Sequence, residues 1–366
     1  MVRIIRKRVL LVISLAVLAA VSCNRDDGQL QEGRLITDST GRKVTIPDTV
    51  SSVIALKSGA LRLLSYMEVT DLVSHVEESE RRRNVPYLFA HPRLRDMPVI
   101  GAGNNYDTEL LAAARTDLII ATFMSKHEAD RVQRVSRKPV VLLDYGDLGS
   151  GIDNLFASID LLGDIFHKKE RADSLVGFIR STIDSCALRA AGATEKQRPA
   201  YIGGVAYNGA HGITSTEPSY PPFDILSVPN IAGALQQNDN ALSHEVVFID
   251  KEQLVDWDPP VLFLDAAGRQ IWEQEISEQQ VISSLSALRR GEAYTVLPYN
   301  WNTTNYENLL SNMWYTGTVM MPSAFGDIDY REKAREVFRF FHGVDIYDEV
   351  EAFYNPYRQL KNDIAE

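Results

Sequence analysis

Apolar residues recur every three or four positions in two neighbouring stretches near the middle of the chain, residues 151–166 and 174–189. This spacing places them on one face of an α-helix, with polar residues on the other face. If residues 168–191 form one helix, it is roughly 35 Å long, close to the diameter of a small domain. The pattern therefore predicts a helix that joins two lobes, or else a long surface helix of one large α/β domain.

Short, continuous apolar runs lie on both sides of this helix and alternate with amphipathic segments. Such runs are typical of parallel strands that helices cover on both faces. Residues 35–47 instead alternate around a Ser-Thr-Gly turn, which predicts an antiparallel hairpin. The other predicted strands are residues 53–56, 72–73, 118–121, 140–143, 200–205, 261–264 and 295–297, and the predicted helices are residues 61–67, 109–114, 128–135, 224–226, 252–256, 281–288, 306–317 and 330–342.

These elements predict an α/β fold of two Rossmann-like lobes with parallel-rich sheets, joined by one long α-helix. Two domains are also the natural expectation for a chain of 366 residues. The expected division is a signal peptide over residues 1–22, a lipid tether over 23–33, an N-terminal α/β lobe over 34–150, linker helices over 151–194 and a C-terminal α/β lobe over 195–366.

The pattern Asp-x-Glu-x-Leu occurs twice, at residues 107–111 and 250–254, and each copy opens a predicted helix that leads to a buried strand. An aspartate at the N-cap accepts hydrogen bonds from the first turn, and a glutamate in that turn interacts favourably with the helix dipole. The repeat therefore predicts that Glu109 and Glu252 occupy equivalent positions on the two lobes.

The N-terminus resembles the signal peptide of a bacterial lipoprotein. Basic residues at positions 3, 6, 7 and 8 precede an apolar run over residues 9–21, and small residues precede Cys23. This order predicts removal of residues 1–22 and acylation of Cys23. The alternatives are an ordinary secretory signal and a short membrane anchor, although the apolar run is shorter than the roughly 20 residues that a spanning helix needs.

The chain is acidic, with a net charge of −11, and cleavage of the basic N-terminus would make it more so. Nucleic-acid partners are excluded, because phosphates require a basic face. The chain has two cysteines. With Cys23 acylated, Cys186 has no partner for a disulfide, and the hydrophobic core has to supply the stability.

The loops after the predicted strands are rich in aromatic, amide and hydroxyl side chains. Ligands of open α/β sheets bind outside the carboxyl ends of the strands, so these loops are the candidate site. A single tyrosine or tryptophan more often packs in a core, but the cluster favours a large organic ligand that stacks on rings. The candidate contacts are Phe123, Met124 and Tyr145 in the first lobe, facing Tyr207, His211, Tyr220 and Trp301 in the second, with Lys57 available for an anionic group.

Motifs of common enzymes do not occur in the sequence: it has no Gly-x-Ser-x-Gly, no Walker loop, no His-Glu-x-x-His and no Cys-x-x-Cys. The histidines do not have metal-site spacing either. His211 lies in a glycine-containing loop, where either a hydrogen bond to a ligand or metal ligation is conceivable, and the former is the commoner role. We therefore expect no cofactor and no metal site.

Several segments together resemble one family, the substrate-binding proteins of ABC importers in the class whose lobes are joined by a rigid helix. The ligands of that class are iron-siderophores, haem and cobalamin. The segments that carry the resemblance are residues 37–47, 109–120, 162–172 and 252–254, and residues 211–223 and 298–305 resemble the branch labelled iron-complex binding.

The resemblance implies a non-enzymatic, monomeric receptor, held in the periplasm by a lipid anchor. It would capture an iron chelate, haem or a corrinoid and deliver it to a dimeric ABC permease with its ATPase. Glu109 and Glu252 would then contact arginines on the two halves of the permease. Two alternatives stay open: a cell-surface enzyme that processes metal chelates with His211 and Asp265, and an adhesin on the same fold.

Overall fold

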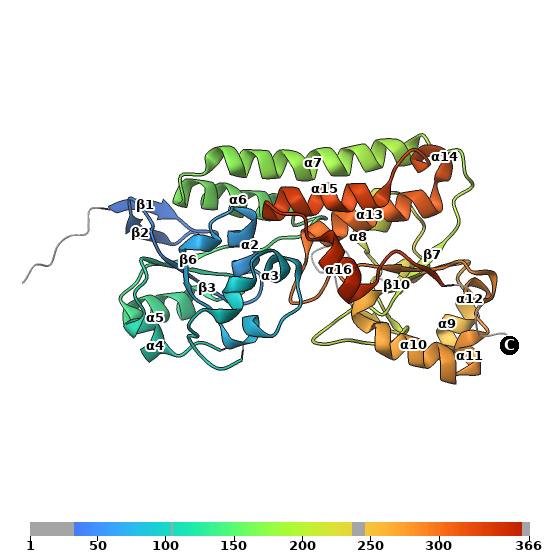
Figure 1. Ribbon diagram of the computed structural model, residues 1–366, viewed down its shortest axis with the longest axis horizontal. Helices are drawn as coiled ribbons and strands as arrows, with labels where there is room; N and C mark the ends of the chain where they lie inside the picture. Colours follow the sequence, from blue (N-terminus) through green and yellow to red (C-terminus); the bar gives the residue numbers. More distant parts are fainter. Residues whose placement is uncertain (1–32, 104, 236–245, 361–366) are drawn as a thin grey trace, which may run out of the picture.

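The computed structural model describes residues 33–103, 105–235 and 246–360, and Figure 1 shows how its elements are arranged. The predicted signal peptide, Cys23 and all but one residue of the predicted tether lie outside the described residues. The remaining tether residue, Gly33, begins strand β1. In the part of the chain that the structure describes, no helix is both long and apolar enough to cross a membrane.

The first lobe is built on a parallel sheet with the strand order β4-β3-β5-β6. Strands β3, β5 and β6 are buried along their whole length, because helices cover both faces. The predicted hairpin is present as β1 and β2, which pair antiparallel. The elements are β1 (Gly33–Thr37), β2 (Lys43–Pro47), β3 (Val53–Leu56), α2 (Ala60–Tyr66), β4 (Val73–His75), α3 (Pro86–Ala90), α4 (Thr108–Ala113), β5 (Leu118–Ala121), α5 (Lys126–Ser136) and β6 (Val140–Leu142).

The second lobe has its own sheet, with the order β12-β11-β10-β7. The strands β7, β10 and β11 are parallel, and β12, from the end of the chain, pairs antiparallel at the edge. The elements are β7 (Ala200–Gly203), β8 (Ser215–Thr216), α8 (Pro221–Ile225), β9 (Val247–Phe248), α9 (Lys251–Trp257), β10 (Val261–Asp265), α10 (Arg269–Glu278), α11 (Gln280–Ser283), α12 (Ser286–Arg290), β11 (Ala293–Val296) and β12 (Gln359–Leu360).

The prediction of a single helix over residues 281–288 is wrong. Leu285 has an extended backbone, with φ −54° and ψ 131°, and separates α11 from α12. Its side chain is buried in the core of the second lobe. The free energy gained by burying this leucine therefore exceeds the free energy that continuing the helix would give.

Helix α7 (Lys169–Ala191) confirms the predicted long connection. It has 23 residues, which corresponds to about 35 Å, and it follows α6 (Ile152–Ile165). Figure 1 shows α7 running along both lobes. Its buried residues, at positions such as 172, 175, 179, 182 and 186, have the spacing of one helix face.

The C-terminal helices return to the first lobe. Helices α13 (Tyr306–Met320) and α15 (Tyr330–His342) pack on each other beside α7, with α14 (Pro322–Phe325) between them in sequence. Helices α15 and α16 (Tyr347–Tyr354) contact α2 or α3 of the first lobe. Residues that the sequence assigned to the second lobe therefore pack against both lobes, and the expected domain boundaries stay a prediction.

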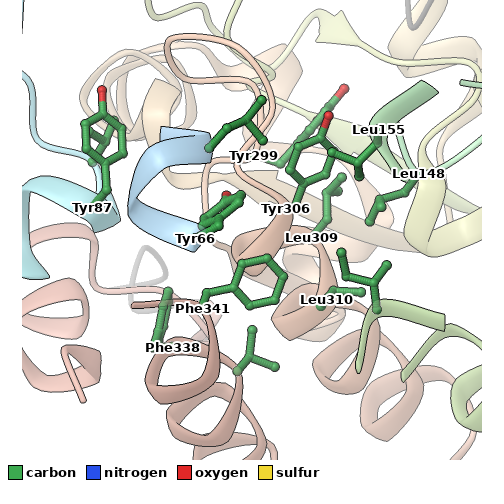
Figure 2. Close-up of a cluster of buried hydrophobic side chains, with 14 of the residues drawn as sticks. Tyr66, Tyr87, Leu148, Leu155, Tyr299, Tyr306, Leu309, Leu310, Phe338 and Phe341 are labelled. Carbon is green, nitrogen blue, oxygen red and sulfur yellow. The ribbon is translucent and has the colours of Figure 1, made fainter. Parts of the chain in front are cut away.

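The two lobes share one continuous apolar core. Figure 2 shows the rings of Tyr66, Tyr306 and Phe341 close together in this core, although they come from α2, α13 and α15. The rings of Tyr66 and Phe341 meet edge to face, with centroids 4.7 Å apart. The region between the lobes where α2, α13 and α15 meet is therefore a packed hydrophobic core.

Candidate functional site

A cavity of about 840 Å³ lies between the lobes. This volume is within the range of roughly 300–1,000 Å³ that is usual for small-molecule sites. Its walls come from residues after β4, from the segment that follows β10, from Trp301 after β11, and from helix α16. The lining residues are Glu78, Ser79, Arg82, Arg83, Asn84, Gly103, Ala210, Ala266, Ala267, Arg269, Gln270, Ile271, Glu273, Trp301, Phe353 and Tyr354.

Arginines line both walls of this cavity, Arg82 and Arg83 in the first lobe and Arg269 in the second. Each is paired with a carboxylate. Arg82 lies 3.4 Å from Glu78, and Arg269 lies 2.8 Å from Glu273. Ion pairs this exposed to water contribute only about 0–1 kcal/mol, so an anionic ligand can compete for Arg82 and Arg269 at little cost.

Arg83 is held more firmly than the other two arginines. It donates to Glu80, which is buried and also accepts a hydrogen bond of 2.6 Å from the hydroxyl of Tyr87. The next residue, Asn84, is also held, because its carbonyl oxygen accepts a hydrogen bond from the hydroxyl of Tyr354 in α16. The first-lobe wall is therefore fixed in place by contacts with its own lobe and with α16.

Three large apolar side chains complete the lining: Trp301, Ile271 and Phe353. Phe353 is 51% exposed, which is unusual for a phenylalanine in a folded chain. Trp301 is a residue that the sequence predicts for the site, whereas Phe353 and the three arginines are not. A phenylalanine on a short amphipathic helix is normally expected in the core, and an arginine is normally expected to face solvent. The sequence pattern therefore does not indicate that Phe353 and these arginines line a ligand site.

The other second-lobe candidates, Tyr207 and His211, form a patch next to the cavity, whose lining includes Ala210. The Nε2 atom of His211 donates to the carbonyl oxygen of Tyr207 over 2.6 Å, and its ring lies 4.7 Å from that of Phe248. Among the described residues, no group of three or more His, Cys, Asp or Glu side chains could hold a metal.

Tyr220 does not face the cavity, contrary to the prediction. It is fully buried, with its ring 4.9 Å from Phe223 and 5.5 Å from Tyr299. Its hydroxyl accepts a hydrogen bond from Asn312. The physical reason is local, because the two prolines that open α8 follow Tyr220 and start a helix that directs its ring into the core of the second lobe.

Of the first-lobe candidates Phe123, Met124 and Tyr145, only Phe123 is exposed. Phe123 is 64% exposed and its ring lies 5.8 Å from that of Tyr145. Tyr145 and Met124 are buried. The hydroxyl of Tyr145 donates to the carbonyl oxygen of Thr304 over 2.6 Å, so this tyrosine links the lobes.

Lys57 lies away from the cavity between the lobes and is already paired. Its Nζ atom is 3.7 Å from Glu128 and 5.3 Å from the centre of the Tyr106 ring. It lines a separate, shallow depression that also includes Glu109. Lys57 is therefore not part of the lining of the cavity between the lobes, and its availability to an anion stays a prediction.

The two predicted helix caps are present. The side chain of Asp107 accepts hydrogen bonds from the amides of Glu109 and Leu110, and that of Asp250 accepts one from the amide of Gln253. Glu109 and Glu252 lie in the first turns of α4 and α9 and are exposed. Exposure leaves both carboxylates accessible to a partner.

Comparison with known proteins gives the family. The family model "Periplasmic binding protein" matches residues 65–299. The molybdate-binding protein MolA of Haemophilus influenzae is 21% identical over 334 residues, which cover 84% of this chain and 91% of MolA.

Solved structures match the fold over most of the chain. MolA with molybdate gives a TM-score of 0.67 at 20% identity, covering 85% of this chain and 98% of MolA. A periplasmic solute-binding protein of Veillonella parvula gives 0.69 at 18% identity, with 88% and 97% covered. A periplasmic haem-binding protein of Pseudomonas aeruginosa gives 0.53 at 16% identity, with 75% and 94% covered. The chain belongs to the periplasmic binding protein family and is the substrate-binding protein of an ABC importer, not an enzyme.

Proposed function

We propose that this protein captures an anionic metal chelate, a ferric siderophore or haem, in the cavity between its lobes and delivers it to an ABC permease. The observation that carries the proposal is the combination of arginines on both walls with the aromatic rings of Trp301 and Phe353 in an otherwise acidic protein. The sequence leaves a corrinoid equally open as the ligand. A corrinoid carries fewer negative charges for these arginines to bind than a ferric siderophore or haem does, so we favour the latter two.

The chemistry of the lining fits such a ligand. A guanidinium group binds a carboxylate through two parallel hydrogen bonds, and Arg82 and Arg269 approach the cavity from opposite lobes. Trp301 and Phe353 offer ring faces on which a flat ligand can stack. We further propose that Tyr207 and His211 contact the part of the ligand that extends beyond the cavity.

A simple oxyanion is the second candidate. It is favoured by the similarity to MolA, which binds molybdate, and by the arginines, which are good donors to oxyanions. We place it second because a cavity of about 840 Å³ has far more room than a single oxyanion fills.

Thermal unfolding with a panel of ligands tests the proposal. The panel is haemin, ferric citrate, a ferric catecholate, cyanocobalamin and sodium molybdate. A ligand present at 100 times its Kd stabilises the folded protein by about 2.7 kcal/mol, which raises Tm. We expect haemin or a ferric chelate to do so. A response to molybdate alone would favour the second candidate, and no response to any of the five would contradict both.

Substitution of the aromatic residues locates the site. We expect Trp301→Ala, and to a smaller extent Tyr207→Ala, to weaken binding of the ligand that responds, by roughly 2- to 10-fold for the loss of one ring contact. Trp257→Phe is the control, because Trp257 lies in α9 outside the cavity lining. If Trp301→Ala and Tyr207→Ala bind as the unmodified protein does, the second-lobe contacts are wrongly assigned.

The family implies a periplasmic or envelope location and an ABC permease with its ATPase as partners. We propose in addition that the chain is anchored through an acyl group on Cys23. Mass spectrometry of the Cys23→Ser variant should show no acylation, and recovery of an acylated variant from the membrane would refute the anchor.

A further inference from the structure

Arg62 is a fully buried arginine of the first lobe whose hydrogen bonds are almost all with the second lobe. One terminal nitrogen donates to the carbonyl oxygen of Thr304 over 2.9 Å and to the hydroxyl of Tyr145. The other donates to the carbonyl oxygens of Trp301 and Asn302, over 3.3 and 3.2 Å, and to the side chain of Asn305 over 2.9 Å. The guanidinium therefore lies at the centre of the loop of residues 299–305.

This loop does not have a conformation that its residues favour. Asn302 and Thr303 are consecutive and both have positive φ angles, 59° and 63°. Asparagine tolerates this region, but it is unfavourable for the β-branched Thr303. Contacts from outside the loop oppose this cost. Besides Arg62, the hydroxyl of Ser58 in the first lobe donates to the side chain of Asn302 over 2.9 Å.

Asn305 supplies the complementary contacts from within the loop. Its Nδ2 atom donates to the carbonyl oxygens of Tyr299, Trp301 and Thr303, over 2.9, 3.0 and 3.2 Å. Its Oδ1 atom accepts from Arg62. Arg62 and Asn305 together bond the carbonyl oxygens of residues 299 and 301–304. Removing Arg62 takes away the hydrogen bond to the carbonyl oxygen of Asn302, and removing Asn305 takes away the one to Thr303, each at a cost in free energy.

We propose that Arg62 is a positioning residue of the ligand site, which acts through the loop of residues 299–305 to place Trp301 opposite the first-lobe arginines. The proposal deepens the proposed function, because it assumes that Trp301 contacts the ligand. It means that a side chain of one lobe sets the position of a ligand contact of the other.

Arg171 provides a matched control. It also connects elements of the two lobes, since it lies in α7 and donates to the carbonyl oxygens of Tyr66 and Phe340. Its contacts do not include the loop of residues 299–305. Replacing either arginine with lysine keeps the charge but loses the planar fork that reaches several acceptors at once.

The first measurement needs no ligand. Hydrogen exchange followed by mass spectrometry should show faster exchange of the amides of residues 300–305 in Arg62→Lys and unchanged exchange there in Arg171→Lys. Unchanged exchange in Arg62→Lys would overturn the proposal. If Arg62→Lys does not fold, Asn305→Asp serves instead, because it keeps the acceptor for Arg62 and removes the three hydrogen bonds donated to the loop.

The second measurement uses haemin as the probe in a double-mutant cycle with Trp301→Ala. We expect Arg62→Lys to weaken haemin binding by roughly 2- to 10-fold, the effect of one misplaced ring, and to have no further effect in the Trp301→Ala background. An equal loss in both backgrounds would show a general structural role and overturn the proposal. If haemin does not bind, the haem assignment fails and the exchange measurement alone decides the role of Arg62.

Discussion

The buried carboxylates of Glu307 and Glu77 titrate differently because their surroundings differ. Burial alone would raise the pKa of Glu307, but a hydrogen bond with His342 at 3.3 Å and the charge of Arg62 bring the pKa of Glu307 below its usual value. For Glu77, burial dominates and raises the pKa to about 7, although its carboxylate accepts a hydrogen bond of 3.2 Å from the amide of Lys57. Glu307 is thus charged in the folded protein at neutral pH, whereas Glu77 binds a proton near that pH.

The raised pKa of Glu77 predicts a pH-dependent stability. Between the usual pKa of 4.5 and about 7, the folded state binds this proton more tightly than the unfolded state does. The contribution of Glu77 is therefore fully present below pH 4.5 and is lost as the pH rises to about 7. We expect Glu77→Gln to remove this dependence, which Tm measured from pH 5 to 8 will show. The same slope in the variant would contradict the prediction.

Among single residues, the sequence predicts those whose role depends on local chain position and misses those whose role depends on distant contacts. Trp301 follows a strand, and the structure places it in the cavity lining. Arg62 is on an amphipathic helix, where an arginine normally faces water, and its buried site is created by carbonyl groups some 240 residues away. For Tyr220, the prolines after it direct the ring away from the cavity, and the core that receives the ring comes from the distant α13 and Tyr299.

At the scale of elements, the glycines of α6 and α7 show where these two helices pack closely and where they do not. Gly177 lies inside α7, and an added Cβ would contact no other atom within 4 Å. Glycine in a helix interior costs about 0.5–1 kcal/mol relative to alanine, chiefly because it has more freedom in the unfolded chain. We predict that Gly177→Ala raises Tm by on the order of 1–2 °C in calorimetry.

Gly163 in α6 is the matched control for that substitution. An added Cβ there would lie 2.7 Å from the Cβ of Ala172 in α7, so Gly163→Ala must push the two helices apart. We expect it to destabilise the protein by about 1–3 kcal/mol. Stabilisation by both substitutions would mean that α6 and α7 are not packed closely at this point.

The elements that the sequence predicts are those with strong patterns of their own. Strands β3, β5 and β10 are continuous apolar runs, and α7 has a long apolar stripe. The strand β12 has two residues, and its pairing with β11 at the sheet edge is what makes it a strand. Short elements of this kind depend on tertiary contacts, and a local pattern cannot reveal them.

At the scale of the whole molecule, the two lobes are connected by more than the predicted helix. They share a core, and α15 and α16 pack against the first lobe while β12 completes the second sheet. The sequence predicts two α/β lobes correctly because each lobe has its own strands. It does not predict that the C-terminal segment contributes to both, because that depends on the path of the chain after α13.

The two lobes also present equivalent surface charges, which the last prediction uses. Glu109 and Glu252 are exposed in the first turns of α4 and α9, and Figure 1 shows both helices on the side of the molecule away from α7. A partner with two-fold symmetry meets a two-lobed protein through equivalent points on each lobe. We therefore propose that both glutamates contact the permease dimer. The plain alternative is that each only interacts with its helix dipole, which contributes about 0.3–1 kcal/mol.

We predict that Glu109→Lys and Glu252→Lys reduce delivery of the ligand to the permease, and that the double variant abolishes it, while ligand affinity and Tm change little. Charge pairs of this kind mainly set orientation and association rate and weaken with salt, so the single variants should be most affected at low salt.

Glu170→Lys is the control, because Glu170 is also exposed in the first turn of a helix, α7, but lies outside the repeated motif. Uptake into vesicles that contain the permease measures the effect. Full uptake by the double variant would mean that both glutamates only stabilise their helices. A large loss of ligand affinity would mean that they face the ligand and not the permease.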